Sequence, residues 1–425
     1  MKPGNRRAFA VSYGLTIGFV LIFASATALS GQAFEQRVDD IVSRARLRLG
    51  PLRFYPVLEF SQFGWVSNIY GVTQAEQLVS DFVITPSPKL NVYFILRRRL
   101  ILSFTENPEY HFYLSSHQYN HFANSYRAEL AFPFFGSLII SAGFYSQSQR
   151  SLSLAELDRQ VETHSQGVRT EVIYETGRRI SFTLTGYFGR QEYKDILGPE
   201  ESSDLLARNL NREESSGAVE LRYQAFSSST LFIRGSYGQY NFLGEETGWR
   251  DSRLVHFLFG FRFPSQGRLS GSLAAGFKRL LNQEGKAKDY SGFIADAQAS
   301  YRLGAVTFLS LGYGHDLMFS YWADMLYYIN DGFNAGLTVN FSRFLAIKLA
   351  GSYNLLHYSG QKEGELTEGG LPPGRSDRYM NFSAGFNIPI FRGLRAGLSY
   401  HYWTRPEGFL GKRDGHLVTF DLIPQ

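Results

Sequence analysis

Long segments in which apolar and polar residues alternate run from about residue 51 to the end of this chain. In residues 126–132, Tyr, Ala, Leu and Phe occupy every second position, and Arg127 and Glu129 lie between them. Residues 219–224 and 418–422 repeat the pattern. Because successive side chains of a strand point to opposite faces, this period predicts β-strands with one apolar and one polar face. A soluble β-sandwich would show the same alternation.

Three further features favour a membrane barrel over a sandwich. The alternating segments are longer than soluble strands, which average about six residues, and match the length that a tilted strand needs to cross a bilayer. Their connections alternate between short and long, as in outer-membrane barrels. Aromatic residues gather towards the strand ends, where membrane girdles lie: Phe132, Phe134, Phe135, Tyr187, Phe188, Phe261 and Phe263. We therefore expect an all-β fold, a transmembrane antiparallel β-barrel of about 18 strands, or 16, over residues 51–425.

The polar phase of the strands predicts which charged side chains face the lumen of such a barrel. They are Arg127, Glu129, Arg169, Glu171, Glu220, Arg222, Arg234, Arg262, Lys278 and Arg395. Both signs occur, so these side chains can form a solvated wall of mutual ion pairs. The alternative is a permeation path that contacts a hydrated polymer. A barrel of this size holds an aqueous channel unless something plugs it.

The two kinds of connection differ in charge. The short turns are basic, with Arg97, Arg98, Arg99, Arg178, Arg179, Arg268, Arg302, Arg343 and Arg392 as candidates for a periplasmic mouth. The long connections carry Glu200, Glu201, Asp204, Glu213, Glu214, Glu245, Glu246, Asp316, Asp324, Glu363, Glu365 and Glu368. This gradient would draw an anionic polymer or an acidic partner to the basic mouth. Alternatively, the arginines only anchor strand ends at the head-group boundary.

The N-terminus has the layout of a secretory signal peptide. Lys2, Arg6 and Arg7 precede an apolar stretch and then small residues, which predicts cleavage after Ala28 or, preferably, after Ala33. An uncleaved membrane anchor is the alternative. Removing residues 1–33 takes away three cations and no anions, so the formal net charge falls from +5 to +2. A basic domain of the kind that binds nucleic acid is therefore not expected.

Residues 34–50 form the expected lead-in to the barrel, in the periplasm. Apolar residues Phe34, Val38, Ile41, Val42 and Leu47 recur among charged ones, which predicts one short amphipathic helix. A flexible lead-in is the alternative.

Nothing in the sequence indicates catalysis or a cofactor. The chain has no cysteine, which excludes disulfides and thiolate metal sites, and it has no nucleophile elbow, zinc helix, phosphate loop or EF-hand loop. Among its nine histidines only the pair His315-Asp316 draws attention, and a location near a strand end explains that pair better than catalysis. We expect that the protein is not an enzyme.

The first two predicted strands resemble a known family. Leu52-Arg53-Phe54-Tyr55-Pro56-Val57-Leu58-Glu59, Ser67-Asn68-Ile69-Tyr70 and Ser80-Asp81-Phe82-Val83-Ile84-Thr85-Pro86-Ser87-Pro88-Lys89-Leu90 resemble the opening of the β-barrel porin 2 family, which is linked to exopolysaccharide operons. Ser67 stands where Asp is usual and Lys89 where Gly is usual. The chain also ends on residues 421–425 rather than on the terminal aromatic that the barrel-assembly machinery recognises, and Phe420 can serve instead.

This resemblance implies a role in polysaccharide export across the bacterial outer membrane. The barrel would be similar to the β-barrel component of polysaccharide export systems, with outer-membrane lipid around it and a separate periplasmic polysaccharide export protein as its partner. A general diffusion porin for small solutes and an adhesive or structural barrel acting through its loops remain the alternatives.

Overall fold

The computed structural model describes residues 31–67, 69, 79–134, 138–151, 156, 160–176, 179–196, 207–226, 228–244, 246–263, 267–342, 345–361, 374–391, 394–408 and 411–424. Most of the predicted signal peptide lies outside the described residues. So do Arg178, Arg343 and Arg392 and the acidic residues Glu200, Glu201, Asp204, Glu245, Glu363, Glu365 and Glu368. Among the described residues, no helix has the length and apolar character needed to cross a bilayer.

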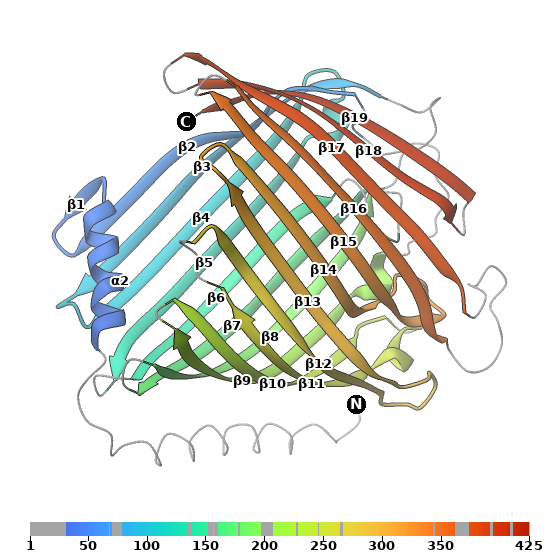
Figure 1. Ribbon diagram of the computed structural model, residues 1–425, viewed down its shortest axis with the longest axis horizontal. Coiled ribbons are helices and arrows are strands. Elements are labelled where there is room, and N and C mark those ends of the chain that lie inside the picture. The colour runs from blue at the N-terminus through green and yellow to red at the C-terminus, as the bar shows by residue number, and fades with distance from the viewer. Residues whose placement is uncertain are drawn as a thin grey trace.

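Within the described part of the chain, α2 (Gly31–Arg44) and the short strand β1 (Leu47–Leu49) precede the long strands (Figure 1). The first nine long strands are β2 (Leu52–Val66), β3 (Asp81–Leu96), β4 (Leu100–Tyr113), β5 (His121–Phe134), β6 (Leu138–Ser151), β7 (Gln160–Thr176), β8 (Ile180–Ile196), β9 (Arg212–Phe226) and β10 (Ser229–Phe242). The other nine are β11 (Ser252–Arg262), β12 (Leu269–Asn282), β13 (Tyr290–Leu303), β14 (Thr307–Phe319), β15 (Met325–Ser342), β16 (Leu345–Gln361), β17 (Ser376–Phe391), β18 (Leu394–Gly408) and β19 (Gly411–Pro424). Short 3-10 helices lie in some of the described connections: η2 (His117–Tyr119), η3 (Ala207–Leu210) and η4 (Gly248–Arg250).

The 18 long strands form one closed antiparallel barrel. Each strand from β2 to β19 pairs with its neighbours in the sequence, and β19 returns to pair with β2. The expected all-β barrel of about 18 strands is therefore confirmed. Closure brings the two edge strands together and so limits the sheet edge that faces lipid, where backbone N–H and C=O groups would lack partners.

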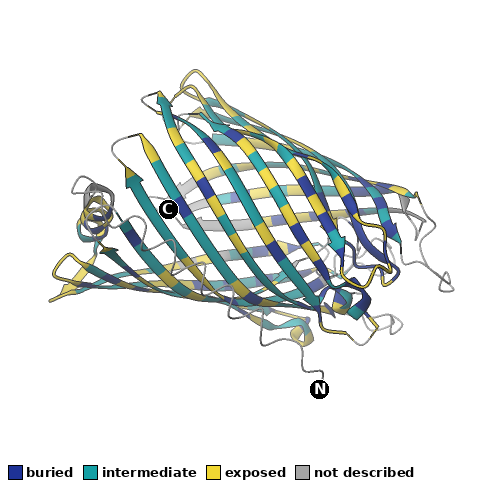
Figure 2. Cartoon of the chain, turned by 90° about the horizontal axis from the view of Figure 1, so that it is seen from below, coloured by how far each residue is buried: buried dark blue, intermediate teal, exposed yellow. Residues whose placement is uncertain are grey.

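The register assigns each strand a lipid-facing and a lumen-facing side (Figure 2). Directly paired residues share a face, so Arg127 lies on the same side as its partners Thr105 on β4 and Tyr145 on β6. The other side of these strands carries exposed apolar residues such as Leu130 and Phe144. A polar inner face and an apolar outer face are what a membrane barrel around water requires.

The barrel has a turn end and a loop end. At the turn end, short connections such as residues 97–99 join the strands, and at the loop end the longer connections do. Several strands are longer at the loop end than the sequence alternation predicts. The predicted connection 146–166 is shortened to residues 152–159, between β6 and β7. The predicted connection 404–414 is shortened to residues 409–410, between β18 and β19. The reason is that backbone pairing between neighbouring strands continues through polar residues beyond the alternating apolar segments. The connection between β4 and β5, residues 114–120, was not predicted.

The closing contact between β2 and β19 is short. A single register pair, Val66 with Thr419, joins the two strands at the loop end of β2. Ser67 extends it, because its backbone N–H donates to the Val418 carbonyl at 3.3 Å and its hydroxyl accepts from the Val418 N–H at 2.9 Å. At the turn end of β2, the short strand β1 pairs with the same edge of β2 that pairs with β19 at the loop end, and Arg48 lies opposite Arg53.

A second weak place lies between β3 and β4. Their pairing stops at Ile84 with Phe112 and resumes only at Leu90 with Glu106. Pro86, Pro88 and Pro108 fall inside this interval, and proline has no N–H to donate to a sheet ladder.

Side chains bridge the β3–β4 interval on the lumen face. Thr85 Oγ1 lies 3.1 Å from His111 Nδ1, and the Ser87 hydroxyl is 3.0 Å from Glu109 Oε1 and 3.2 Å from Asn107 Oδ1. These contacts partly replace the missing backbone hydrogen bonds.

We predict that the amide hydrogens of residues 107 and 109–111 exchange faster than those of residues 101–106 on the same strand. The reason is that the first group lacks ladder partners on β3, whereas the second has them. Hydrogen-exchange mass spectrometry of the protein in detergent micelles measures this difference. Equal protection of the two groups would show that the ladder is continuous.

Candidate functional site: the barrel lumen

Ion pairs between charged side chains line the inner wall of the barrel. Glu220 is 7% exposed and faces three guanidinium groups: Arg222 contacts it, Arg262 Nη2 lies 3.5 Å away and Arg234 Nη1 lies 4.0 Å away. Lys278 contacts Asp316 across β12–β14. The lumen wall is therefore charged but largely compensated within itself.

The register places nine of the ten sequence-derived lumen candidates on this inner face: Arg127, Glu129, Arg169, Glu171, Glu220, Arg222, Arg234, Arg262 and Lys278. For Arg395 the register gives the backbone partners Pro389 and Ile423, and its side chain lies outside the described part of the chain. Arg169 lies 3.6 Å from Glu171, and Arg127 lies 3.8 Å from Glu129.

A pocket of 680 Å³ opens on the inner wall between β4 and β11. Its lining includes three guanidinium groups, several tyrosines and several hydroxyl and amide side chains. Such a surface can donate hydrogen bonds to a polyhydroxylated or anionic molecule in the lumen.

The helix α2 lies inside the turn end of the barrel (Figure 1). Its residues Phe34, Val38 and Ile41 are buried in one apolar cluster with wall residues of β3 to β6: Ile95, Ile101, Ala131 and Ile139. Ile101 and Ala131 pair with each other on the face that also carries Glu129, which is the lumen face. The predicted lead-in segment therefore packs against the wall rather than extending away from the barrel. The reason is that the apolar stripe of the helix meets an apolar patch on the inner face of β3 to β6.

Polar contacts also fix α2 at the turn end. Arg37 Nη2 donates to Glu129 Oε1 at 2.7 Å, and Arg98 Nη2 of the β3–β4 turn donates to Asp39 Oδ1 at 2.5 Å. The Tyr55 hydroxyl contacts the Ile41 carbonyl. The helix thus covers part of the wall at the turn end of the lumen.

At the loop end, residues from five connections or strand ends meet in one cluster, which we call the loop-end knot: Glu156, Asn209, Arg250, Ser320–Leu326 and Arg405. The tip of the β14–β15 hairpin, residues 320–324, is its centre. Ser320 and Tyr321 both donate to the Glu156 carboxylate, Tyr321 through its backbone N–H at 3.0 Å. Asn209 Nδ2 donates to the Tyr321 carbonyl at 2.9 Å.

Two arginines complete the knot. Arg250 is fully buried and donates to the carbonyls of Asn209 at 2.9 Å, Ser320 at 2.5 Å and Leu326 at 3.3 Å. Arg405 near the end of β18 donates to the Glu156 carbonyl at 3.1 Å. Because these groups belong to strands around much of the barrel, the knot ties the loop end together.

The environment of Glu156 makes this knot sensitive to pH. Burial raises the pKa of its carboxyl to about 7, although the hydrogen bonds from Ser320 and Tyr321 and the charges of Arg250 and Arg405 lower it. Sequence reasoning missed this residue, because a single Glu in a polar connection carries no periodic or motif signal.

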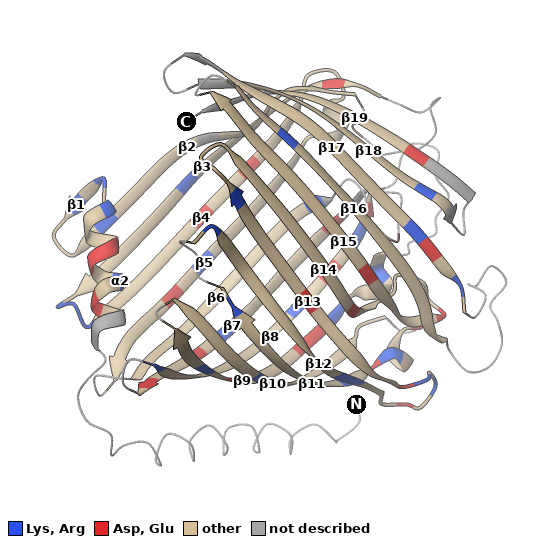
Figure 3. Cartoon of the chain, viewed as in Figure 1, with Lys and Arg blue, Asp and Glu red and all other residues tan. Residues whose placement is uncertain are grey.

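The basic residues at the turn end are spread rather than gathered in one site (Figure 3). Arg97, Arg98 and Arg99 lie in the β3–β4 turn, where Arg97 and Arg98 adopt φ values of 47° and 56°. Arg179 and Arg268 are exposed beside their turns. Arg302 lies at the end of β13, and its guanidinium carbon sits 5.4 Å from the centre of the Phe308 ring.

The pair His315-Asp316 does not form a site, because adjacent strand residues point to opposite faces. Asp316 faces the lumen and contacts Lys278, whereas His315 faces outwards and its Nδ1 lies 2.7 Å from Asp331 Oδ1. His357 Nε2 is 3.8 Å from the other oxygen of Asp331. This polar group sits on the outer wall near the loop end, where strands leave the hydrocarbon.

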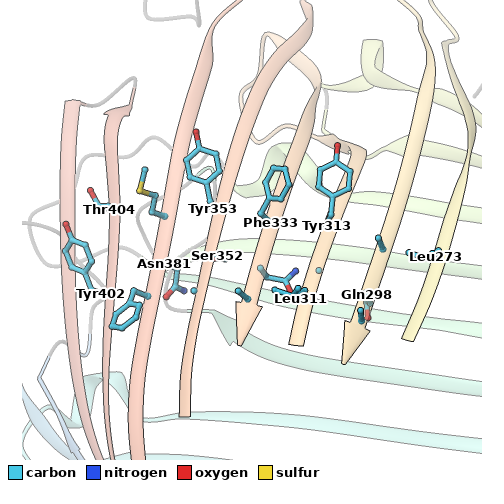
Figure 4. A pocket seen from close by; sticks show the side chains of 18 residues that line it. Leu273, Gln298, Leu311, Tyr313, Phe333, Ser352, Tyr353, Asn381, Tyr402 and Thr404 are labelled. Atoms are coloured by element: carbon cyan, nitrogen blue, oxygen red, sulfur yellow. The ribbon is translucent and has the colours of Figure 1, made fainter. Parts of the chain in front are cut away.

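An apolar groove of 760 Å³ crosses the outer wall over β12 to β18 (Figure 4). Large side chains such as Tyr313, Phe333 and Tyr353 line it, and Ala297, Ala335 and other small residues deepen it. The register places these residues on the lipid-facing side, so the groove fits lipid chains and is separate from the lumen.

A sequence profile of the family described as "Putative beta-barrel porin 2" matches residues 139–406, which is more than half of the chain. The chain belongs to this family. The matched segment begins in β6 and ends in β18, so the family assignment rests on most of the barrel wall rather than on its first two strands.

Comparison with solved structures finds an outer-membrane barrel with the same fold as this porin 2 family member. The apoprotein of the FrpB iron transporter from Neisseria meningitidis is 9% identical, with a TM-score of 0.50, over 90% of this chain and 67% of that one. OpdO from Pseudomonas aeruginosa is 12% identical, with a TM-score of 0.49, over 87% of this chain and 96% of that one. No curated protein sequence matches the chain.

We predict that Val38→Asp releases α2 from the wall of this porin 2 barrel. Val38 is fully buried, and an unpaired carboxylate at that position costs several kcal/mol. Because the chain has no cysteine, a single cysteine placed at Ile101, under the helix, reports its position. Labelling of I101C by a water-soluble maleimide should rise about tenfold or more in the V38D background.

The matched control is Asp40→Asn on the exposed face of the same helix, which should leave labelling of I101C low. Rapid labelling of I101C in the otherwise unchanged protein would contradict the position of α2.

We also predict that the loop-end knot weakens as the pH rises from 5 to 8. The pKa of Glu156 is about 7 in the knot and 4.5 for an ordinary glutamate, so the knot binds the proton more tightly than the separated loops do. Its stability is therefore greatest below pH 4.5 and falls by on the order of 3 kcal/mol as the pH rises to 7.

The measurement is conductance of the reconstituted V38D protein in planar bilayers. It should increase with pH, and Glu156→Gln, which keeps the side chain neutral, should remove the dependence. A pH response that persists in the E156Q variant would assign the effect to another group.

Proposed function

We propose that this barrel is an outer-membrane channel that exports a secreted polysaccharide, delivered by a separate periplasmic export protein, with no chemistry in the barrel itself. The observation that carries the proposal is the inner wall, where ion-paired charges and hydroxyl groups line an 18-strand lumen. At this strand number a lumen is wide enough for a hydrated chain. A wall whose charges are paired with one another offers weak, repeated contacts rather than one tight site.

Contacts at both ends of the lumen support a channel whose opening is controlled. The helix α2 covers part of the wall at the turn end, and the knot joins connections at the loop end. A permanently open diffusion porin needs neither feature. A channel for a long polymer benefits from narrowing at its ends, since an unoccupied wide pore would leak small solutes.

The turn end offers a surface for the periplasmic partner. Arg97, Arg99, Arg179 and Arg268 are exposed at different turns of this end, and Asp39 of α2 pairs with Arg98 of the β3–β4 turn. A partner that binds this rim could also displace α2, because the polar contacts at this end involve exposed groups such as Arg98 and Asp39.

The test is a strain that lacks the gene, complemented with the wild-type protein or with variants. The deletion should abolish a surface polysaccharide, and wild-type protein should restore it. A protein with Cys pairs that lock the knot closed, placed at Ser320 and Asn209, should restore export only under reducing conditions. Retention of every surface glycan in the deletion strain would contradict the proposal.

A further inference from the structure

Aromatic and cationic side chains alternate along one belt of the lumen wall. Arg127 on β5 lies opposite Tyr145 on β6, and Arg169 on β7 lies opposite Tyr187 on β8. Tyr187 in turn lies opposite Ser216 on β9. All five residues line the same 680 Å³ pocket.

The two tyrosines of the belt form a flat surface. Their rings are 6.0 Å apart between centroids and inclined by only 21°, and the Tyr145 hydroxyl donates to the Tyr187 hydroxyl at 2.6 Å. Gly167 and Gly189 make room for the Tyr187 ring. A Cβ at Gly189 would lie 2.6 Å from Cζ of Tyr187, and a Cβ at Gly167 would lie 2.9 Å from its Cε2. The ring can therefore lie against the wall only because both positions lack a side chain.

The charged groups beside this surface are cationic. Arg127, Arg169 and Arg234 line the pocket, and its described lining contains no carboxylate. Their side chains are 57%, 50% and 42% exposed. Their ion-pair partners Glu129, Glu171 and Glu220 lie 3.6 to 4.0 Å away, which is longer than a hydrogen bond. In addition, Arg234 Nε is buried with no hydrogen-bond partner.

This arrangement matches an acidic sugar residue. One face of a pyranose ring is a set of C–H groups, which packs on a flat aromatic surface, while its hydroxyl groups accept hydrogen bonds from the wall. A carboxylate on the sugar would take paired hydrogen bonds from a guanidinium group. A neutral glycan can accept hydrogen bonds from the three arginines but forms no ion pair with them, and a protonated amino sugar is repelled by them.

We propose that the belt of Tyr145 and Tyr187 with Arg127, Arg169 and Arg234 is a subsite for uronic acid units, so that the polymer passing through this lumen is an acidic polysaccharide. This inference rests on the proposed export function and gives its substrate class.

The experiment measures binding of short oligouronates, and of neutral glucan oligosaccharides of the same length, to the purified full-length protein by isothermal titration calorimetry. The oligouronate should bind at least about tenfold more tightly than the neutral oligosaccharide, and added salt should weaken it. Replacing Arg127, Arg169 and Arg234 together by Gln should remove this preference. Tyr187→Leu should weaken both ligands, because the flat surface is lost.

The matched control is Arg190→Gln. Arg190 lies on the same strand as Tyr187 but faces away from the lumen, 2.6 Å from Glu192, so this variant should bind as the wild type does. Retention of the heat-modifiable band on gels shows that each variant is folded.

The outcomes separate this inference from the proposed function. Equal affinity for the neutral and acidic oligosaccharides, or a preference that survives the triple Arg→Gln change, would overturn the acidic subsite even if the deletion strain loses its glycan. Conversely, a deletion strain that keeps every surface glycan would overturn export, while selective oligouronate binding would still establish the anionic subsite.

Discussion

The hydrogen bonding of the strand backbone is the constraint on which this structure depends. Within lipid, each N–H and C=O group needs a partner in the protein, so a sheet can span the membrane only if it closes on itself. Most neighbouring strands meet this demand with ten or more register pairs, as β7 and β8 do. The weakest contacts are the one-pair contact between β2 and β19 and the proline-rich interval that interrupts the β3–β4 ladder. There, side chains such as Ser67, Thr85 and Ser87 supply part of the missing bonding. The first strands of the barrel are therefore its weakest part.

The two ends of the lumen carry two different kinds of interaction. At the turn end, the apolar stripe of α2 packs on an apolar patch of the inner wall, and two surface ion pairs add little to that burial. At the loop end, the knot depends on buried hydrogen bonds to Glu156 and Arg250. A hydrophobic contact can be replaced by another apolar surface, such as that of a partner, whereas the buried polar knot responds to protonation.

The sequence predicts the strands of the barrel wall well, but it does not predict the position of α2, the loop-end knot or the tyrosine belt. The alternation in residues 126–132 predicts which side chains of β5 face the lumen, because a two-residue period determines both burial and register in a strand. The apolar spacing of Phe34, Val38 and Ile41 predicts an amphipathic helix but not the surface it packs against, because many apolar surfaces could receive it. Glu156 and Arg250 meet only through distant connections, so no local pattern marks them. The prediction that Tyr187 belongs to a membrane girdle is wrong, because it lies opposite Arg169 on the lumen face in the middle of β8. The belt of Tyr145 and Tyr187 was therefore missed, although Gly167 and Gly189 beside it are a usable signal, since glycine inside a strand often marks a close approach.

The most direct test of the central claim, a closed barrel around a polar lumen, is cysteine scanning along β5. The chain contains no cysteine, so each single substitution at residues 127–130 is read without background. A water-soluble maleimide should label positions 127 and 129, which face the lumen, and leave positions 128 and 130 unlabelled in a bilayer. Equal labelling of all four positions, or labelling of 128 and 130 alone, would contradict the account.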